Sequence, residues 1–211
     1  MKDLFFNFLF NSQNKSSYSY KLRKKRFERF IKELDIDGRT KILDVGGAEA
    51  TWSDFEHKKN VTILNVNKEE KSNHVNFILG DACNMAMFQN NSFDVIYSNS
   101  VLEHVGKDRQ IDYAREICRV SKRFWIQTPN KFFPLEPHFL FPFFQFMPYK
   151  LKIFVGMKWK YSHLRKNREN IIDELNRLNL LSIKELRKLF PNGKIIKEKI
   201  FFFTKSFIVY L

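Results

Sequence analysis

Cysteine and long apolar runs are scarce in this sequence, and each scarcity excludes a class of protein. Two cysteines in 211 residues, Cys83 and Cys118, fit neither a disulfide framework nor a cysteine metal site, and they indicate a reducing compartment. The five histidines are scattered without ligand spacing, so we expect no metal site. No apolar run is long enough to span a bilayer, and residues 1–10 lack the basic lead and cleavage site of a signal peptide. These absences predict a cytoplasmic protein, and the length suffices for one domain with a sizeable core.

Acidic side chains are also in deficit, and the deficit is uneven along the chain. The formal net charge is +14. Residues 1–30 carry +6, residues 31–120 carry −4 and residues 121–211 carry +12. The basic ends predict an anionic partner: a phosphorylated or lipid-linked substrate, a membrane surface or nucleic acid. A solvated basic surface without a partner is the alternative.

One short stretch, residues 41–50 (Lys-Ile-Leu-Asp-Val-Gly-Gly-Ala-Glu-Ala), organises the rest of the chain. Its apolar, β-branched start predicts a buried strand. Gly46 and Gly47 follow, where small residues allow a tight turn and the close approach of a ligand. A strand, a small-residue turn and a helix form the nucleotide pocket of a doubly wound sheet. The carboxylate of Asp44, just before the glycines, suits a cationic or hydroxyl-bearing ligand better than a pyrophosphate, which it would repel.

The same stretch resembles motif I of the class I S-adenosylmethionine-dependent methyltransferases, in which an acidic residue precedes Gly-x-Gly-x-Gly. Asp44 matches the acidic residue and Gly46 the first glycine, whereas Ala48 and Ala50 stand at the second and third glycines. The resemblance implies that S-adenosylmethionine is the co-substrate and that Asp44, Gly46, Gly47 and Ala48 bind it. Because alanine tolerates positive φ poorly, either the turn differs here or the affinity for the cofactor is reduced.

Two further predicted strands carry candidate cofactor ligands at their ends. Asn65, in the strand predicted at 61–66, stands where the family has an acidic residue that binds both ribose hydroxyls. Its amide oxygen can still accept a hydrogen bond, so the resemblance implies weaker ribose binding. The strand predicted at 75–79 is followed by Gly-Asp-Ala, as in the family, where Asp81 accepts from the adenine amino group and the backbone at Ala82 reaches the ring. A solvent-exposed Asn65 and a simple Asx turn at Asp81 are the alternatives.

The run at residues 92–105 (Ser-Phe-Asp-Val-Ile-Tyr-Ser-Asn-Ser-Val-Leu-Glu-His-Val) closely resembles motif IV of the type-11 methyltransferase group. The fourth strand would end at Ser98 and Asn99, which would line the pocket near the transferable methyl group. The four residues that end at Glu103 have capping-box spacing, so we expect Glu103 to begin a helix rather than to act in catalysis. His104 would lie in the first turn of that helix, either as a general base or as a polar contact without a catalytic role.

Residues 129–142 follow the predicted fifth strand and contain four prolines, which predict a stiff, non-helical segment. In the family, substrate-specific loops are inserted here. Glu136 and His138 are two residues apart, so in an extended segment their side chains would point the same way. We interpret the segment as a lid over the acceptor site, with His104, His138 and Glu136 as candidate catalytic residues. A proline-rich strut that covers the sheet edge is the alternative.

Residues 143–168 mix aromatic with basic side chains. This mixture suits an anionic membrane interface, and it also suits stacking on single-stranded nucleic acid. We favour a peripheral membrane contact over nucleic acid, because base-methylating enzymes of this fold commonly carry an Asn/Asp-Pro-Pro-aromatic motif where this chain has Ser-Asn-Ser-Val at 98–101.

The combined pattern predicts an α/β fold: a Rossmann-like, doubly wound sheet, mostly parallel, with helices on both faces and a C-terminal antiparallel hairpin. We expect the hairpin strands at 195–203 and 206–211, joined by a turn at 204–205, after a helix that opens with a capping box at 182–185.

The predicted domains are an N-terminal amphipathic helical segment, residues 1–36, and a methyltransferase domain, residues 37–211. The helix is expected over 18–34, and a Pro/aromatic/basic insertion at about 129–170.

These inferences lead to the hypothesis of an S-adenosylmethionine-dependent methyltransferase. Its acceptor would be a small molecule, for which a glycan- or lipid-linked compound at a membrane surface is one candidate. A non-catalytic binding protein with the same fold is the alternative, motivated by Ala48, Ala50 and Asn65. A nicotinamide-dependent oxidoreductase is disfavoured by Asp44 before the glycines and by the closing hairpin.

Overall fold

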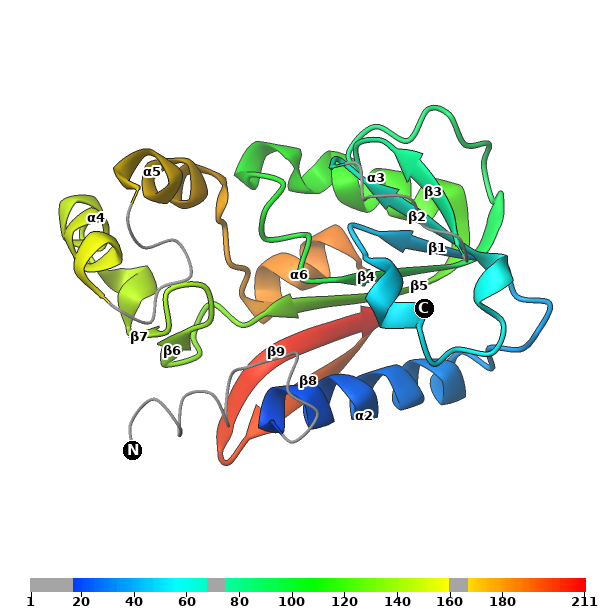
Figure 1. The fold of residues 1–211 in the computed structure, drawn as a ribbon, viewed down its shortest axis with the longest axis horizontal. Helices are drawn as coiled ribbons and strands as arrows, with labels where there is room; N and C mark the ends of the chain where they lie inside the picture. The colour runs from blue at the N-terminus through cyan, green and yellow to red at the C-terminus, as the bar shows by residue number, and fades with distance from the viewer. Residues whose placement is uncertain (1–16, 68–74, 160–166) are drawn as a thin grey trace. The chain divides into compact units, whose positions relative to one another are not determined.

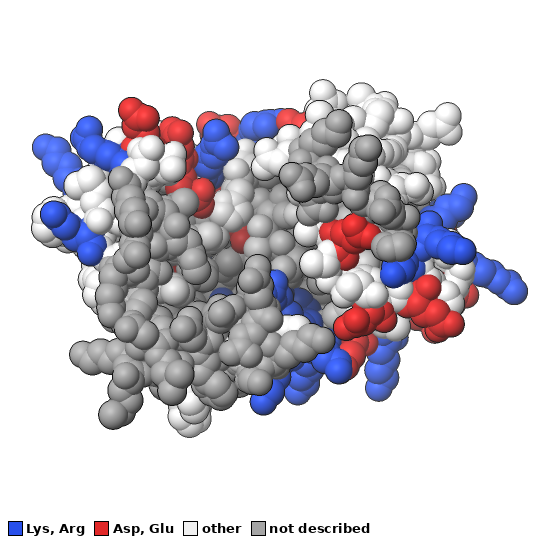
Figure 2. Space-filling view, in the orientation of Figure 1, with Lys and Arg blue, Asp and Glu red and all other residues white. Residues whose placement is uncertain are grey.

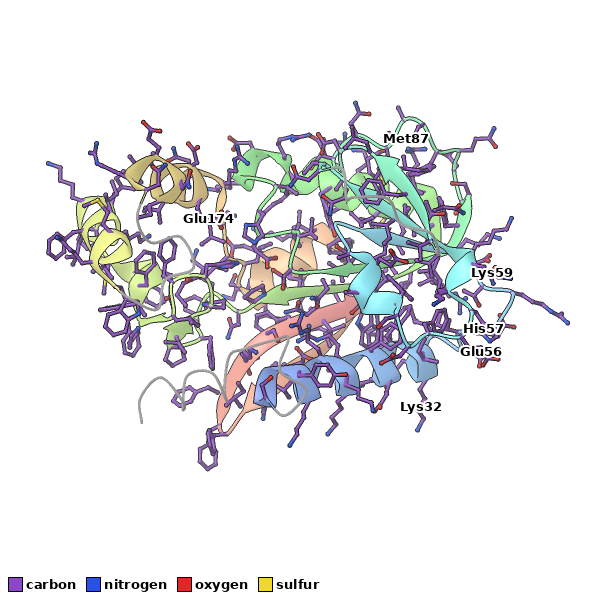
Figure 3. All side chains as sticks on the ribbon, in the orientation of Figure 1. Lys32, Glu56, His57, Lys59, Met87 and Glu174 are labelled. Carbon is purple, nitrogen blue, oxygen red and sulfur yellow. The ribbon has the colours of Figure 1, made fainter. Side chains whose placement is uncertain are left out.

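The computed structural model describes residues 17–67, 75–159 and 167–211, and it divides into two compact units, residues 1–40 and 41–211. The first unit contains α2 (Tyr18–Glu33), which confirms the helix predicted there. Ser17 caps this helix by accepting a hydrogen bond from the backbone N–H of Tyr20, and Lys32 lies in its last turn (Figure 3). The expectations for residues 1–10 fall outside the described residues.

The second unit is built on a seven-stranded sheet in the order β3-β2-β1-β4-β5-β9-β8 (Figure 1). Neighbouring strands from β3 to β5 are parallel, whereas β9 runs antiparallel to both β5 and β8. The predicted mostly parallel sheet with a C-terminal antiparallel hairpin is confirmed. The strands are β1 (Ile42–Val45), β2 (Val61–Asn65), β3 (Asn76–Leu79), β4 (Phe93–Asn99), β5 (Ser121–Pro129), β8 (Lys194–Ile200) and β9 (Phe203–Tyr210).

Two helices, α3 (Gln110–Val120) and α6 (Ile183–Leu189), cover one face of this sheet. Buried strand residues such as Leu43 and Ile126 form one apolar cluster with Ile117 of α3 and Leu186 of α6. All four residues of β1 are buried, so this inner strand of the sheet is covered on both faces. The capping box predicted at 182–185 is confirmed at the start of α6. None of the helices in the described ranges is long and apolar enough to cross a membrane.

The insertion after β5 has a small core of its own. It holds a two-stranded hairpin, β6 (Leu135–Glu136) and β7 (Phe141–Pro142), then α4 (Tyr149–Lys158) and α5 (Arg168–Arg177). Figure 1 shows the two helices together at one end of the unit. The core comprises the fully buried Phe139 and Ile171 and the nearly fully buried Phe144, and the rings of Phe139 and Phe144 stack with centroids 4.0 Å apart. The predicted non-helical character of residues 129–142 is confirmed.

The helix predicted to begin near Ser100 is absent, and the capping-box prediction for Glu103 is wrong. Ser100 has φ +59°, its hydroxyl donates to the Gln127 side chain, and its N–H donates to the Gln127 carbonyl. These bonds hold Ser100 against β5, so it cannot cap a helix. The chain instead makes turns up to a 3₁₀ helix, η3 (Lys107–Arg109), and α3 begins at Gln110.

Two smaller predictions also need correction. The helix expected after the glycines is a single 3₁₀ turn, η1 (Glu49–Trp52). Two other 3₁₀ turns lie later in the chain: η2 (Lys58–Asn60) and η4 (Phe144–Phe146). The hairpin turn lies at Phe201 and Phe202, about three residues earlier than predicted, because β9 already pairs with β8 from Phe203 onward. These two phenylalanines are 88% and 94% exposed.

The crossover from β3 to β4 contains no helix, and side chains of α3 hold it in place. Glu116 accepts a hydrogen bond from the Met85 N–H at 2.6 Å. Arg119 donates to the Met85 and Phe88 carbonyls and pairs with Glu116 at 2.7 Å. The hydrogen bonds from Arg119 lower the pKa of Glu116, although burial opposes the shift.

We predict that Glu116→Gln lowers the free energy of unfolding by about 1–2 kcal/mol at neutral pH. A lowered carboxyl pKa stabilises the fold above the unfolded-state pKa of about 4.3, and this stabilisation is lost as pH falls through the folded-state pKa. The difference between wild type and variant should therefore shrink towards pH 3 in urea titrations. Asp112→Asn, in an exposed pair on the same helix, is the control and should cost under about 0.5 kcal/mol. An unchanged difference at pH 3 would contradict this role.

Candidate active site

The carboxyl ends of β1, β2, β3 and β4 lie along one edge of the sheet, since these strands are parallel neighbours. The glycine turn leaves β1 at this edge. Gly46 has φ +72° and donates its N–H to the Leu64 carbonyl at 2.7 Å. A Cβ on Gly46 would stand 2.4 Å from a methyl of Val101, so the loop after β4 packs directly on the turn. The segment that contains Glu103 and His104 thus lies beside the glycine turn.

Asp44 supports the turn from below. It is 1% exposed, and its Oδ2 accepts a hydrogen bond from the Trp52 indole at 2.7 Å. A Cβ on Gly47 would lie 1.8 Å from this carboxylate, so only glycine fits above it. Because Asp44 lies so close to Gly47, the turn carries no side chain at this position. A bound cofactor could therefore contact the backbone of the turn directly. Ala48 has φ −137°, an extended conformation, so alanine meets no strain at the second glycine position.

Asn65 lies at the end of β2 and contacts the glycine turn. Its amide nitrogen donates to the Gly47 carbonyl at 3.0 Å, and its oxygen accepts from the Asn67 N–H at 3.1 Å. The amide therefore holds the turn to β2. An amide oxygen has a second lone pair, which leaves it able to accept one more hydrogen bond.

Asp81 and Ala82 follow β3, at the same edge. Asp81 accepts a hydrogen bond from the Cys83 N–H at 2.9 Å and forms an ion pair with Arg109. Burial raises the pKa of Asp81, but the hydrogen bonds from Arg109 and Cys83 outweigh it and the pKa is lowered. Asp81 stays ionised in this arrangement, and about 40% of its side chain is exposed.

Ser98 and Asn99 end β4. Ser98 is fully buried, and its hydroxyl donates to the Val45 carbonyl at 3.0 Å. It ties β4 to the last residue of β1, whereas Asn99 is half-buried at the strand end. The structure thus brings Asn65 and Asn99 to the edge beside the glycine turn, and it turns the Asp44 and Ser98 side chains inward beneath that edge.

A chain of four side chains joins the insertion to the loop after β4. His138 Nδ1 lies 2.6 Å from Glu136 Oε1, and His138 Nε2 lies 3.1 Å from His104 Nε2. His104 Nδ1 in turn lies 3.1 Å from Glu174 Oε1. Glu136 also accepts hydrogen bonds from the His138 and Phe139 backbone N–H groups. The three candidate catalytic residues predicted from the sequence, His104, His138 and Glu136, are therefore in one network.

Two members of this cluster were not among the sequence candidates. Glu174 belongs to α5 and is labelled in Figure 3. No local sequence pattern indicates its contact with His104, which lies 70 residues earlier in the chain. Glu103 was assigned to a helix start, but it is fully buried and accepts a hydrogen bond from Thr128 at 2.9 Å. The capping-box spacing of residues 100–103 masked this role in the sequence.

The carboxylates set the protonation of the cluster. Burial acts to lower the pKa of His138, but the hydrogen bond and charge of Glu136 outweigh it and the pKa is raised. The hydrogen bond from His104 lowers the pKa of Glu174. Burial raises the pKa of Glu103. The neighbouring Glu136 carboxylate therefore favours a positive charge on His138.

The loop that carries Glu103 is held rigidly. Gln110 donates to the carbonyls of Leu102 and Asn179 at 3.1 and 3.0 Å, and the Asn179 N–H donates to the Glu103 carbonyl at 2.7 Å.

A separate pocket of about 580 Å³ lies between α3 and α6 and is lined by residues such as Ala114 and Leu189. Its lining contains none of the residues predicted for the site.

Comparisons with known proteins agree with this geometry. The sequence of residues 42–123 matches the family described as "Methyltransferase domain". No curated protein matches the chain. A methyltransferase structure from Archaeoglobus fulgidus, described as SAM dependent, is similar with a TM-score of 0.59 and 12% identity, over 99% of this chain and 98% of that one.

Two more solved structures share the fold. A protein of Pyrococcus horikoshii OT3 has a TM-score of 0.57 and 17% identity over 99% of this chain and 95% of its own. The magnesium protoporphyrin IX methyltransferase of Synechocystis PCC 6803, solved with bound SAH, has a TM-score of 0.52 and 12% identity over 88% of this chain and 81% of its own. Residues 42–123 therefore match a methyltransferase domain of the type-11 group, and the chain has the fold of these methyltransferase structures.

Proposed function

We propose that this methyltransferase transfers a methyl group to a hydroxyl of a glycan- or lipid-linked acceptor, and that His104, His138 and Glu136 form the acceptor side of its site. The observation that supports this most is the contact between the imidazole of His138, in the insertion, and that of His104, 3.1 Å away. His104 belongs to the loop after β4, which packs on Gly46 through Val101. Direct methyl transfer requires side chains that hold the acceptor close to the bound cofactor.

On the cofactor side, we propose that the turn from Gly46 to Ala48, Asn65, Asn99 and the segment at Asp81 and Ala82 contact S-adenosylmethionine. Asp44 and Ser98 are proposed to act from beneath, because both side chains are buried: Asp44 accepts from the Trp52 indole, and Ser98 donates to the Val45 carbonyl. The ion pair with Arg109 leaves Asp81 with part of its carboxylate accessible to the adenine amino group.

The chemistry divides between cofactor and protein. S-adenosylmethionine, when bound, supplies a methyl group on a sulfonium sulfur, which is already a good leaving group. The protein has to orient the acceptor, exclude water and remove a proton from its hydroxyl. Glu136 and Glu174 orient His138 and His104 through their Nδ1 atoms. An unprotonated Nε2 of this pair can accept the hydroxyl proton.

A membrane-associated acceptor is supported by the surface of the insertion. Large apolar side chains of α4 and the segment before it are about half exposed; they include Phe143, Phe146, Tyr149 and Phe154. Lysines are interleaved with them in α4. Figure 2 shows basic side chains along the edge formed by α4 and α5, with acidic side chains among them. Exposed aromatic rings beside cations suit an anionic lipid interface.

We predict that Gly47→Ala weakens binding of S-adenosylhomocysteine by at least about tenfold, because the new Cβ would overlap the Asp44 carboxylate and displace the turn. Isothermal titration calorimetry measures this. Ala48→Gly, which removes a methyl at an extended position, is the control and should change the affinity less than about threefold. Equal effects of the two substitutions would contradict the assignment of the turn.

We predict that His138→Ala lowers the rate of methyl transfer by about 100-fold and changes the S-adenosylhomocysteine affinity less than threefold, since it removes an acceptor-side group only. The assay follows the tritiated methyl group of S-adenosylmethionine into a membrane glycolipid extract. His57→Ala, in the loop before β2, is the matched control (Figure 3). An equal loss of rate and of affinity would remove His138 from the acceptor side. Cofactor binding without transfer by the wild type would favour a non-catalytic binding protein.

We predict that Lys150→Gln weakens binding to vesicles of anionic phosphatidylglycerol by about fivefold, since each cation near such a surface contributes about 1 kcal/mol. Lys59→Gln, an exposed lysine in η2, is the control and should leave vesicle binding unchanged. Cosedimentation at low salt measures both. Absence of wild-type binding to these vesicles would exclude the membrane contact while leaving the methyltransferase assignment intact.

A further inference from the structure

The two imidazoles of the cluster meet in an arrangement that needs a cation between them or on one of them. A neutral imidazole has one N–H donor and one acceptor nitrogen. Both Nδ1 atoms face carboxylates, of Glu136 and Glu174, to which they must donate. The Nε2 atoms of His104 and His138 then both present lone pairs, and they lie 3.1 Å apart. Two facing lone pairs at this distance are stable only with a positive charge at the Nε2 face.

A buried carboxylate points into the same place. Glu103 has no solvent-exposed surface, and its Oε2 accepts from Thr128. Its Oε1 is buried and accepts no hydrogen bond from another side chain or backbone group within the described ranges. The ligand atoms of Glu103, His104 and His138 all lie within 4.8 Å of one another. An unsatisfied buried oxygen is costly, so a native partner is expected at this position.

We propose that Glu103, His104 and His138 bind a divalent first-row transition metal ion. Two imidazole nitrogens and one carboxylate oxygen suit manganese, iron, cobalt, nickel or zinc better than magnesium or calcium, which prefer oxygen ligands alone. Metal–nitrogen bonds of about 2.1 Å separate neighbouring ligands by roughly 3.0–3.4 Å, and the observed 3.1 Å between the Nε2 atoms falls in this range. The ligands come from the loop after β4 and from the lid, so sequence spacing alone does not indicate the site.

The surroundings of the three ligands match those of a metal site. Metal-binding histidines usually donate their other ring N–H to a carboxylate, which fixes the tautomer and the ring orientation. Glu136 does this for His138, and Glu174 does it for His104. Three carboxylates around two imidazoles carry an excess of negative charge that a divalent cation balances. The side chain of His104 is 33% exposed, so the cluster is open to solvent on one side.

This inference deepens the proposed function, because it concerns the acceptor side of that same site. Three protein ligands leave positions open for an acceptor hydroxyl, whose pKa the metal lowers so that its proton passes to solvent. The imidazoles then serve as ligands rather than as bases. The metal also joins the lid, through His138, to the loop beside the glycine turn.

The test is titration of untagged, metal-stripped protein with Co²⁺, followed by calorimetry and by visible absorption. We expect one Co²⁺ per chain with a ligand-field spectrum, displacement by Zn²⁺, and no displacement by Mg²⁺ at equal concentration. Glu103→Gln, which keeps the shape of the side chain, and His138→Ala should each abolish the stoichiometric binding. Glu136→Gln and Glu174→Gln should weaken it about tenfold, as loss of outer hydrogen bonds does. Circular dichroism verifies that each variant is folded.

His57→Ala, which removes a histidine outside the cluster, is the control and should bind Co²⁺ as the wild type does (Figure 3). Failure of the wild type to bind Co²⁺ stoichiometrically, or binding that survives both Glu103→Gln and His138→Ala, overturns the proposal. A proton shared between the Nε2 atoms would give the first of these results. S-adenosylhomocysteine titration of the same samples is independent of the metal, so a failed metal site and a failed methyltransferase assignment are distinguishable.

Discussion

The buried carboxylate of Asp44 is the constraint on which the site depends. A carboxylate with 1% exposure needs hydrogen-bond donors inside the protein, and the Trp52 indole supplies one to Oδ2 from the first turn after the glycines. The carboxylate then occupies the space below Gly47, which explains why a residue without Cβ is required there. Asn65 fixes the turn from the β2 side, and Val101 packs on it from the β4 side. The turn is thus formed before any ligand arrives.

The second organising contact is between His104 and His138. The insertion has its own core around Phe139, so its position over the sheet edge depends on a few polar contacts rather than on a shared apolar interior. The Nε2–Nε2 contact is one of these, and the Glu174 contact with His104 is another. Both contacts join ionisable side chains of the insertion to His104 in the loop after β4.

The sequence predicted the parts of the fold that depend on neighbouring residues. The apolar strands, the capping box at Ser182 and the helix predicted at residues 18–34 follow from local patterns, and the mostly parallel sheet with its closing hairpin follows from the family resemblance. The candidates His104, His138 and Glu136 were identified correctly as one group, in that the structure brings them into contact. Their chemical roles stay predictions.

The missed features depend on contacts between distant segments. Ser100 and the three residues after it have the spacing of a capping box, but the Ser100 hydroxyl donates to Gln127 on β5 instead of capping a helix. Phe201 and Phe202 look like strand residues, yet the pairing of Phe203 with Ile200 makes them a turn. Glu174 reaches His104 from a helix whose position is set by the insertion's own core. No local spacing encodes such contacts, because each is decided by the packing of elements far apart in the chain.

The central claim is that the glycine turn and the imidazole pair form one site. Nuclear magnetic resonance of the histidine side chains during titration with S-adenosylhomocysteine tests it most directly. If the two parts share one pocket, the imidazole signals of His104 and His138 shift with the same saturation curve as the backbone signals of Gly46 and Gly47, while those of His57 stay in place. Saturable binding that shifts the glycine signals and leaves both imidazoles unchanged would contradict the account.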